Sequence, residues 1–152
     1  MPAEKNIVIF DLDGTLANID DRREKSMKPN GKLNWDKFSS DELIKKDLPN
    51  IPVIKTAKLF HQSGFKIYVL SGRSINTKRV TTQWLKKYDV PFDVLKMREK
   101  NDNTPDEVIK KEYVVKLAIL DNIFLIFDDR EKVVKMWRSL GLPCFQVNEG
   151  NF

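Results

Sequence analysis

The sequence predicts an α/β fold, a three-layer, Rossmann-like parallel sheet with helices on both faces and a small insertion after the first strand. Two observations support this class. Short apolar runs at Asn6–Phe10 and Ile123–Phe127 are bounded by polar turn residues, as buried strands are. Segments with apolar residues at helical spacing alternate with such runs along the chain, which is the order that builds a parallel sheet covered on both faces.

The elements can be placed in order along the chain. Residues of about 17–50, dense in charges of both signs, are interpreted as a small, poorly regular, cap-like insertion. Apolar stripes predict four helices, with Gly64 and Gly141 as stop signals and the Thr104 hydroxyl as a cap. These helices are expected at Pro52–Ser63, Thr77–Tyr88, from Thr104 onward and at Arg130–Leu140, and the further strands at Phe65–Leu70, Asp93–Met97, Ile123–Phe127 and Cys144–Val147.

Composition limits the class of protein. The 152 residues, 41% hydrophobic and 32% charged, fit one soluble domain spanning 1–152. The longest stretch without charge, Ser139–Asn148, is too short for a membrane span of about 20 residues, and the polar start predicts no signal peptide. One cysteine and one histidine argue against disulfides and zinc clusters and favour a reducing cytoplasm. A net charge of +5 favours a polyanionic partner.

Three polar signatures follow predicted strands. They are Asp11-Leu12-Asp13-Gly14-Thr15, Ser71-Gly72-Arg73 and Asp128-Asp129. Because the carboxyl ends of parallel strands share one edge of a sheet, four carboxylates are expected to crowd together there. Like charges that close repel each other unless a cation intervenes, and Mg²⁺ suits oxygen ligands beside a phosphate. Asp11 and Asp13 lie two residues apart in an extended chain and can therefore flank one phosphate.

These signatures, with a lysine before the final Asp pair, resemble the haloacid dehalogenase superfamily of phosphohydrolases. A closer similarity runs through R-E-K-N-D-N-T-P-D-E-V-I-K-K-E, F-D-D-R and V-V-K-M-W-R-S-L-G-L-P-C-F-Q-V-N-E-G-N-F. These segments resemble the 3′-phosphatase domain of bacteriophage polynucleotide kinase–phosphatases. The chain has neither GxxxxGK[ST] nor GxGxxG, so the kinase half of such enzymes has no counterpart in it.

The resemblance implies a role for each matching residue. Asp11 would attack phosphorus and form an aspartyl-phosphate, while Asp13 would act as general acid and then general base. Lys110 would offset charge at the nucleophile, and Asp106, one turn earlier, could orient it. Mg²⁺ would be held by Asp11, the Asp13 main-chain carbonyl and Asp128, with Asp129 in the outer shell. The remaining matches would bind substrate, and they are Ser71, Gly72, Arg73, Arg22 and Arg98, together with Asp106.

Simpler explanations exist for several of these residues. Arg22 and Arg98 could be solvated surface charges, and Asp106 could be an acid at a helix N-terminus. Trp84, Trp137 and Cys144 are expected in the core. Trp35 in the insertion could stack on a nucleobase or pack the insertion down.

Three functions therefore compete. The first is a Mg²⁺-dependent polynucleotide 3′-phosphatase acting on DNA or RNA ends. The second is a phosphatase of nucleoside monophosphates (a 5′-nucleotidase) or of another small phosphate ester. The third is a module that binds phosphate ends without turnover, against which the intact Asp11 and Asp13 argue. The oligomeric state is undecided, with a homodimer permitted by the open rim, and a phage-encoded protein would act in the cytoplasm of a bacterial host.

Overall fold

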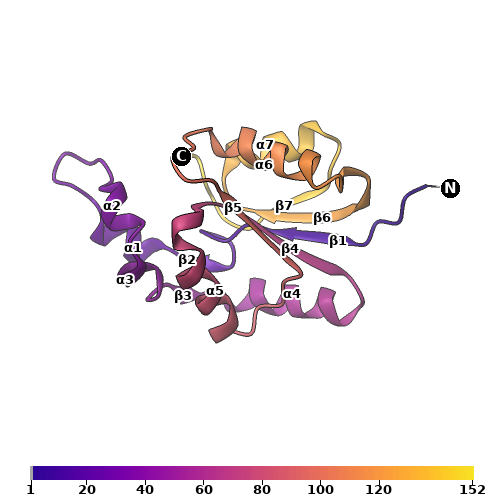
Figure 1. Ribbon diagram of the computed structural model, residues 1–152, viewed down its shortest axis with the longest axis horizontal. Coiled ribbons are helices and arrows are strands. Elements are labelled where there is room, and N and C mark those ends of the chain that lie inside the picture. The colour runs from indigo at the N-terminus through magenta and orange to yellow at the C-terminus, as the bar shows by residue number, and fades with distance from the viewer. Residues whose placement is uncertain (1) are drawn as a thin grey trace.

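A computed structural model, which describes residues 2–152, contains a five-stranded parallel sheet between two layers of helices (Figure 1). The strand order is β5-β4-β1-β6-β7. The predicted α/β class is therefore confirmed. The strands are β1 (Ile7–Phe10), β4 (Lys66–Ser74), β5 (Val94–Arg98), β6 (Ile123–Asp128) and β7 (Cys144–Gln146), and the covering helices are α4 (Ile51–Gln62), α5 (Lys78–Lys87), α6 (Asp106–Lys116) and α7 (Glu131–Ser139).

The two layers of helices are packed by alternate side chains of β1. Val8 and Phe10 belong to the apolar cluster under α4 and α5, whereas Ile7 and Ile9 belong to the cluster under α6 and α7. This is the alternation expected of a central strand that is buried on both faces. Trp84, Trp137 and Cys144 are buried in these clusters, as predicted.

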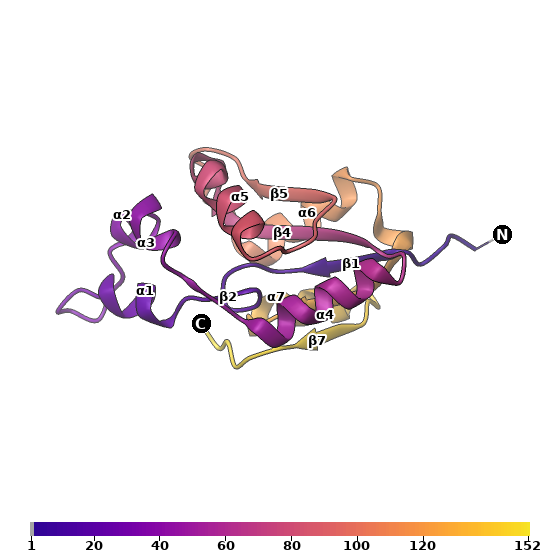
Figure 2. The ribbon, with the colours of Figure 1, turned by 90° about the horizontal axis from the view of Figure 1, so that it is seen from below.

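The segment between β1 and α4 forms a small lobe at one end of the sheet. The two-residue strands β2 (Ala17–Asn18) and β3 (Leu48–Pro49) pair antiparallel and enclose it. Between them lie three short helices, α1 (Asp20–Lys25), α2 (Trp35–Phe38) and α3 (Asp41–Ile44). Figure 2 shows these helices grouped beyond the end of β1 that is opposite the N-terminus. These helices are four to six residues long and the strands two, too short to show a sequence period, which is why the sequence indicates a poorly regular segment here.

Two further details of the sequence-based expectations are corrected. Strand β4 continues through Ser71-Gly72-Arg73 to Ser74 instead of ending before them. The cap of α6 is Pro105 and not the Thr104 hydroxyl, which donates to Asp102 Oδ1 at 2.6 Å. Within residues 2–152 no helix has the length and apolar character needed to cross a bilayer.

Candidate active site

Three buried carboxylates meet where β1 and β6 end. Asp11 directly follows β1, Asp128 is the last residue of β6, and Asp129 comes next. One carboxylate oxygen from each residue lies within 4.8 Å of the others. The neighbouring parallel strands explain this convergence, because Phe10 pairs with Phe127 and the Asp11 amide donates to the Phe127 carbonyl at 2.9 Å. The predicted meeting at one edge is therefore observed for these three carboxylates. The Asp13 carboxylate, expected among them, instead bonds to Arg22 and Arg73, because the chain turns after Leu12.

Lys110 brings a positive charge into this cluster from the middle of α6. Its Nζ donates to Asp11 Oδ1 at 2.8 Å and to Asp128 Oδ2 at 3.0 Å, and the residue is only 3% exposed. The indole N–H of Trp137 also donates to Asp128 Oδ2, at 3.3 Å, and the Thr15 hydroxyl donates to Asp11 Oδ2 at 3.2 Å. Asp11 and Asp128 are thus held in place by donors from α6, α7 and the turn after β1.

The electrostatics of this cluster favour a bound cation. Burial and the neighbouring Asp128 raise the pKa of Asp11 well above its usual range, although Lys110 opposes them. Burial likewise raises the pKa of Asp129. Burial disfavours the charged lysine, but Asp11 and Asp128 outweigh it and raise the pKa of Lys110. One lysine cannot neutralise three carboxylates, so the charge balance is incomplete without another cation or a proton.

Glycine is required at two positions of the rim. Gly14 has a φ of +84°, and a Cβ there would overlap with the Asp129 carboxylate. A Cβ at Gly72 would lie 2.6 Å from Asp106 Oδ1. The two glycines therefore let the β1 turn and the β4 strand approach the acidic side chains more closely than any other residue would allow.

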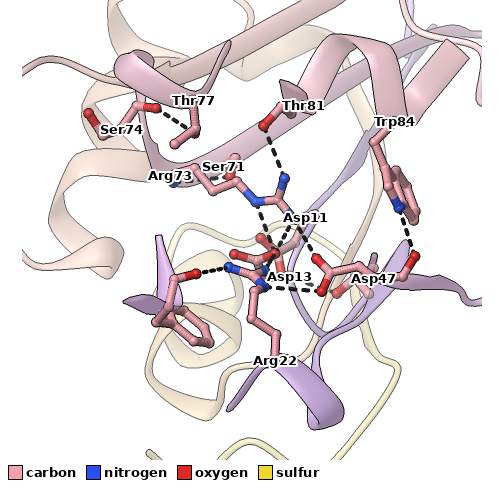
Figure 3. Close-up of polar contacts among 12 residues, drawn as sticks. Asp11, Asp13, Arg22, Asp47, Ser71, Arg73, Ser74, Thr77, Thr81 and Trp84 are labelled. Atoms are coloured by element: carbon pink, nitrogen blue, oxygen red, sulfur yellow. Dashed lines mark hydrogen bonds and ion pairs between the residues drawn. The ribbon is translucent and has the colours of Figure 1, made fainter. Parts of the chain in front are cut away.

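A second charged cluster, formed by Asp13, Arg22, Asp47 and Arg73, lies beside Asp11 (Figure 3). Asp13 Oδ1 accepts from Arg22 Nη2 at 2.6 Å and from Arg73 Nη2 at 2.5 Å. The same two guanidinium groups donate to Asp47, Arg22 through Nε at 3.1 Å and Arg73 through Nη2 at 3.3 Å. Arg73 also donates to the Thr81 hydroxyl at 3.0 Å. Two carboxylates and two guanidiniums thus alternate in one network that ties the insertion to the sheet.

The pKa values of the two acids in this network move in opposite directions. Burial opposes ionisation of Asp13, but Arg73 and Arg22 outweigh it and lower the pKa to about 2. Burial raises the pKa of Asp47 to about 6, against the pull of Arg22 and Arg73. Asp13 is therefore a carboxylate at neutral pH in this arrangement, whereas Asp47 is easily protonated.

Three further residues that the sequence predicts for the site are Ser71, Arg98 and Asp106. Ser71 is buried beside the cluster, where its Oγ accepts from the Arg73 amide at 3.1 Å. Arg98 is not a solvated charge, because it donates to the carbonyls of Gly72 and Thr104 at 2.8 and 2.5 Å. It lines the same cavity as Asp11, and its role in binding phosphate stays a prediction. Asp106 accepts from Arg98 at 2.5 Å and from Arg130 at 2.8 Å, so these two arginines hold it in place. That it orients Lys110 stays a prediction, and the Asp106 charge contributes to raising the pKa of Lys110.

Several residues of the site carry little or no signal in the sequence. Asp47 carried no signal, because it lies among many charges of the insertion and reaches Arg22 and Arg73 only through the fold. Arg130 was read only as the start of a helix. Thr15 could have been found, since it stands within D-L-D-G-T and contacts Asp11. Arg22 is buried, so its reading as a solvated surface charge is wrong.

Both clusters open into one cavity of about 1010 Å³. The carboxylates and Lys110 lie in its wall on the sheet side, and residues of α1 and α2 form the wall on the insertion side. The cavity is large enough for a phosphate ester with a substantial organic group, because small-molecule sites span about 300–1,000 Å³.

The fold and this site define a phosphatase of the haloacid dehalogenase type. A haloacid dehalogenase-like hydrolase from Streptococcus pneumoniae has the same fold, with a TM-score of 0.69 over 93% of this chain and 83% of its own, at 10% identity. The family model for the phosphatase domain of polynucleotide kinase PNKP matches residues 5–152. The chain therefore belongs to this phosphatase domain family and is a phosphoric monoester hydrolase by class.

Two relatives show greater sequence identity. A chain in the structure of the Pnkp1/Rnl/Hen1 complex is 38% identical, with a TM-score of 0.81 over 99% of this chain and 48% of its own. A protein of Autographa californica nuclear polyhedrosis virus, described as a bifunctional polynucleotide kinase/RNA ligase, is 30% identical over 90% of this chain and 18% of its own. The chain thus spans only about half or less of these two relatives.

Proposed function

We propose that this chain is a Mg²⁺-dependent polynucleotide 3′-phosphatase that removes terminal phosphates from DNA or RNA ends. The observation that carries the proposal is the convergence of Asp11, Asp128, Asp129 and Lys110 at the wall of a cavity that also contains Arg22 and Arg73. The polynucleotide substrate is supported by the family match and by the RNA repair complex in which a 36% identical chain occurs.

Asp11 is the nucleophile in this proposal. Its carboxylate would attack phosphorus and displace the alcohol of the nucleic acid, forming an aspartyl-phosphate that water then hydrolyses. Lys110, already 2.8 Å from Asp11 Oδ1, would keep that carboxylate ionised and oriented. Ser71 would donate its hydroxyl to a phosphoryl oxygen, since it is buried at the same cavity wall.

The acidic cluster fits Mg²⁺, because it offers only hard oxygen donors and carries more negative charge than Lys110 offsets. We propose Asp11, the Asp13 main-chain carbonyl and Asp128 as ligands, with Asp129 beside them. When bound, the ion would reduce the repulsion between the nucleophile and the phosphoryl group.

Asp13 is proposed as the acid–base residue. In the arrangement observed it is an ionised carboxylate, which suits the base that takes a proton from the hydrolytic water. Acting first as a general acid requires that Arg22 and Arg73 release it. Both guanidiniums are also the groups that would bind the phosphate bidentately, so substrate binding and release of Asp13 would occur together.

A substrate panel with free phosphate as the readout tests the proposal. Oligonucleotides with 3′-phosphate or 5′-phosphate are compared with nucleoside monophosphates, with and without Mg²⁺. The 3′-phosphorylated oligonucleotide should be hydrolysed fastest, and chelation should abolish the reaction. Preferred cleavage of mononucleotides would instead favour the nucleotidase alternative. Phosphate release that persists after thorough chelation would contradict the metal site.

The Asp11→Asn variant is the chemical control. An amide cannot form the aspartyl-phosphate, so activity should fall by more than about a thousandfold. Burial already disfavours the Asp11 charge, and Lys110 keeps its bond to Asp128 when Asp11 is replaced, so the metal-free variant should melt at or above the temperature of the wild type. Asp121→Asn, an exposed change outside the site, should alter neither quantity. A fully active Asp11→Asn protein would assign the nucleophile elsewhere.

The proposed partners are therefore nucleic-acid ends that carry a terminal phosphate. The cytoplasmic location and the phage origin stay predictions from the sequence. The kinase/RNA ligase relative described above comes from a baculovirus and not from a phage.

A further inference from the structure

Trp35, the first residue of α2, is an exposed aromatic side chain at the substrate cavity. It is 66% exposed, the largest fraction among the exposed large hydrophobic residues within 2–152. It lines the same cavity as Asp11, Asp13 and Lys110. A side chain whose role was to pack the insertion down would bury most of its ring, which this one does not.

The indole ring is nevertheless connected to the catalytic residues. It lies edge-to-face with Phe38, with ring centroids 5.7 Å apart and planes at 88°. The guanidinium of Arg22 lies 4.3 Å from the Phe38 ring centroid and donates to the Phe38 carbonyl at 2.9 Å. Arg22 also donates to Asp13. A series of contacts from Trp35 through Phe38 and Arg22 to Asp13 therefore positions the indole ring relative to the site. A perpendicular contact with Phe38 leaves most of the indole surface open.

The two walls of the cavity differ in chemistry. The sheet side carries the carboxylates and Lys110, which suit a phosphoryl group with a cation. The insertion side presents the apolar groups of Met27, Leu33 and Trp35 beside the guanidiniums of Arg22 and Arg23. A ligand that fits both walls joins a phosphate to a flat, partly apolar ring, as a nucleotide does. A small aliphatic phosphate would leave the apolar wall in contact with water.

We propose that Trp35 stacks on the nucleobase of the terminal nucleotide whose 3′-phosphate lies at Asp11. This inference rests on the proposed function and adds to it the group that recognises the nucleoside. Stacking on an aromatic side chain accepts any base, because every base has a π-face. The enzyme should accordingly require a terminal base without requiring a particular one.

The test compares two 3′-phosphorylated oligonucleotides, one intact and one with an abasic terminal nucleotide. On the intact substrate, Trp35→Ala should lower kcat/KM between about fivefold and a hundredfold, mostly through KM. Removing the base should lower kcat/KM of the wild type by a similar factor. On the abasic substrate Trp35→Ala should cause no further loss, and Trp35→Tyr should retain most activity on the intact one.

Controls separate stacking from a structural role. Val115→Ala removes a similarly exposed side chain, 60% exposed on α6 away from the cavity, and should leave both substrates unaffected. Hydrolysis of glycerol 2-phosphate, which has no base, should be the same for Trp35→Ala and wild type. An equal loss by Trp35→Ala on intact, abasic and glycerol substrates would overturn the inference, as would no loss on any of them.

A further control places the stacking at the terminal nucleotide. Moving the abasic position to the penultimate nucleotide should preserve the effect of Trp35→Ala, and losing the effect there would overturn the assignment to the terminal base. The proposed function fails separately, if the wild type releases phosphate from neither 3′-phosphorylated oligonucleotide while it still hydrolyses other phosphate esters.

Discussion

The charged residues of the site are largely buried, and each of its basic side chains lies between two carboxylates. Lys110 lies between Asp11 and Asp128, and Arg22 and Arg73 lie between Asp13 and Asp47. Burying such charges is costly, and removing one partner of a buried pair costs about 3–5 kcal/mol because the other charge is left uncompensated. A site of this kind is held in one geometry by its own electrostatics, at the expense of stability.

Asp47 is the residue whose replacement best tests this arrangement. Arg22 donates to its Oδ1 and Arg73 to its Oδ2, so Asp47→Asn leaves one guanidinium facing an amide N–H₂. We expect kcat/KM for the 3′-phosphorylated oligonucleotide to fall about tenfold to a hundredfold, equivalent to one or two steps of 1.36 kcal/mol. Asp41→Asn, an exposed change in the same insertion, is the control. Unchanged activity of Asp47→Asn would show that the arginines need no second acid.

The same substitution makes a prediction about pH. Burial raises the pKa of Asp47 from 3.8 to about 6, so the folded protein holds this proton more tightly than the unfolded chain does. The contribution of Asp47 to stability is therefore fully present below about pH 4 and falls as pH rises to about 6. The asparagine of Asp47→Asn does not titrate, so the stability of the variant does not decrease in this way. Urea unfolding of the metal-free proteins should show that the free energy of unfolding of Asp47→Asn rises relative to that of the wild type between pH 4 and 7, by at most about 3 kcal/mol. A gap that is constant with pH would contradict it.

The sequence was most informative about residues that lie near one another in short motifs. The convergence of Asp11, Asp128 and Asp129 is predictable because each follows a strand and the parallel strands end at one edge. Asp13 departs from it, because its carboxylate bonds to Arg22 and Arg73. The contacts of Arg98 and Asp47 depend on how loops fold back over that edge. No periodicity encodes such contacts, so the sequence does not reveal that Arg98 holds the Gly72 and Thr104 carbonyls or that Asp47 joins the two arginines.

Among the elements, the turn after β1 has the strictest steric requirement. Gly14→Ala should place a Cβ where the Asp129 carboxylate lies and should therefore displace a member of the acidic cluster. We expect phosphate release to fall at least tenfold, together with a loss of thermal stability. Both quantities can be measured on the same preparation.

Gly64→Ala is a matched control for this turn. Gly64 also has a positive φ, +93°, but a Cβ added there would have no other atom within 4 Å. The variant should lose about 1 kcal/mol of stability from backbone strain and keep its activity. If Gly64→Ala lowered activity as much as Gly14→Ala, backbone strain alone would explain both results.

Helices and strands of the sheet were predictable because each has an apolar face that packs in one of two clusters. The pattern of Val133 and Trp137, for example, predicted the buried face of α7. The insertion was not predictable in the same way. Helices of four residues, such as α2 and α3, are stabilised by side-chain caps at Asn34 and Ser40 and by contacts with the rest of the fold.

At the scale of the whole molecule, charge and shape act together. The sheet and the insertion enclose a cavity whose lining includes Arg23 and Lys132 as well as the catalytic residues. With a net charge of +5, the protein should attract polyanions before any specific contact forms. Whether that attraction comes from net charge or from basic residues at the cavity can be decided by the effect of salt.

The salt dependence of KM distinguishes the two sources. If Arg23 and Lys132 each contact one phosphate of a single strand, KM should rise with the salt concentration raised to a power of about 1.4. Between 50 and 200 mM salt this is an increase of about sevenfold. Lys132→Gln should reduce that rise to about 2.6-fold, because one contact of exponent about 0.7 remains. Lys55→Gln on α4 removes the same charge outside the cavity and should leave the sevenfold rise intact. Equal effects of Lys132→Gln and Lys55→Gln would mean that net charge alone attracts the substrate. With a small phosphate ester, the wild type and both variants should show almost no salt dependence of KM.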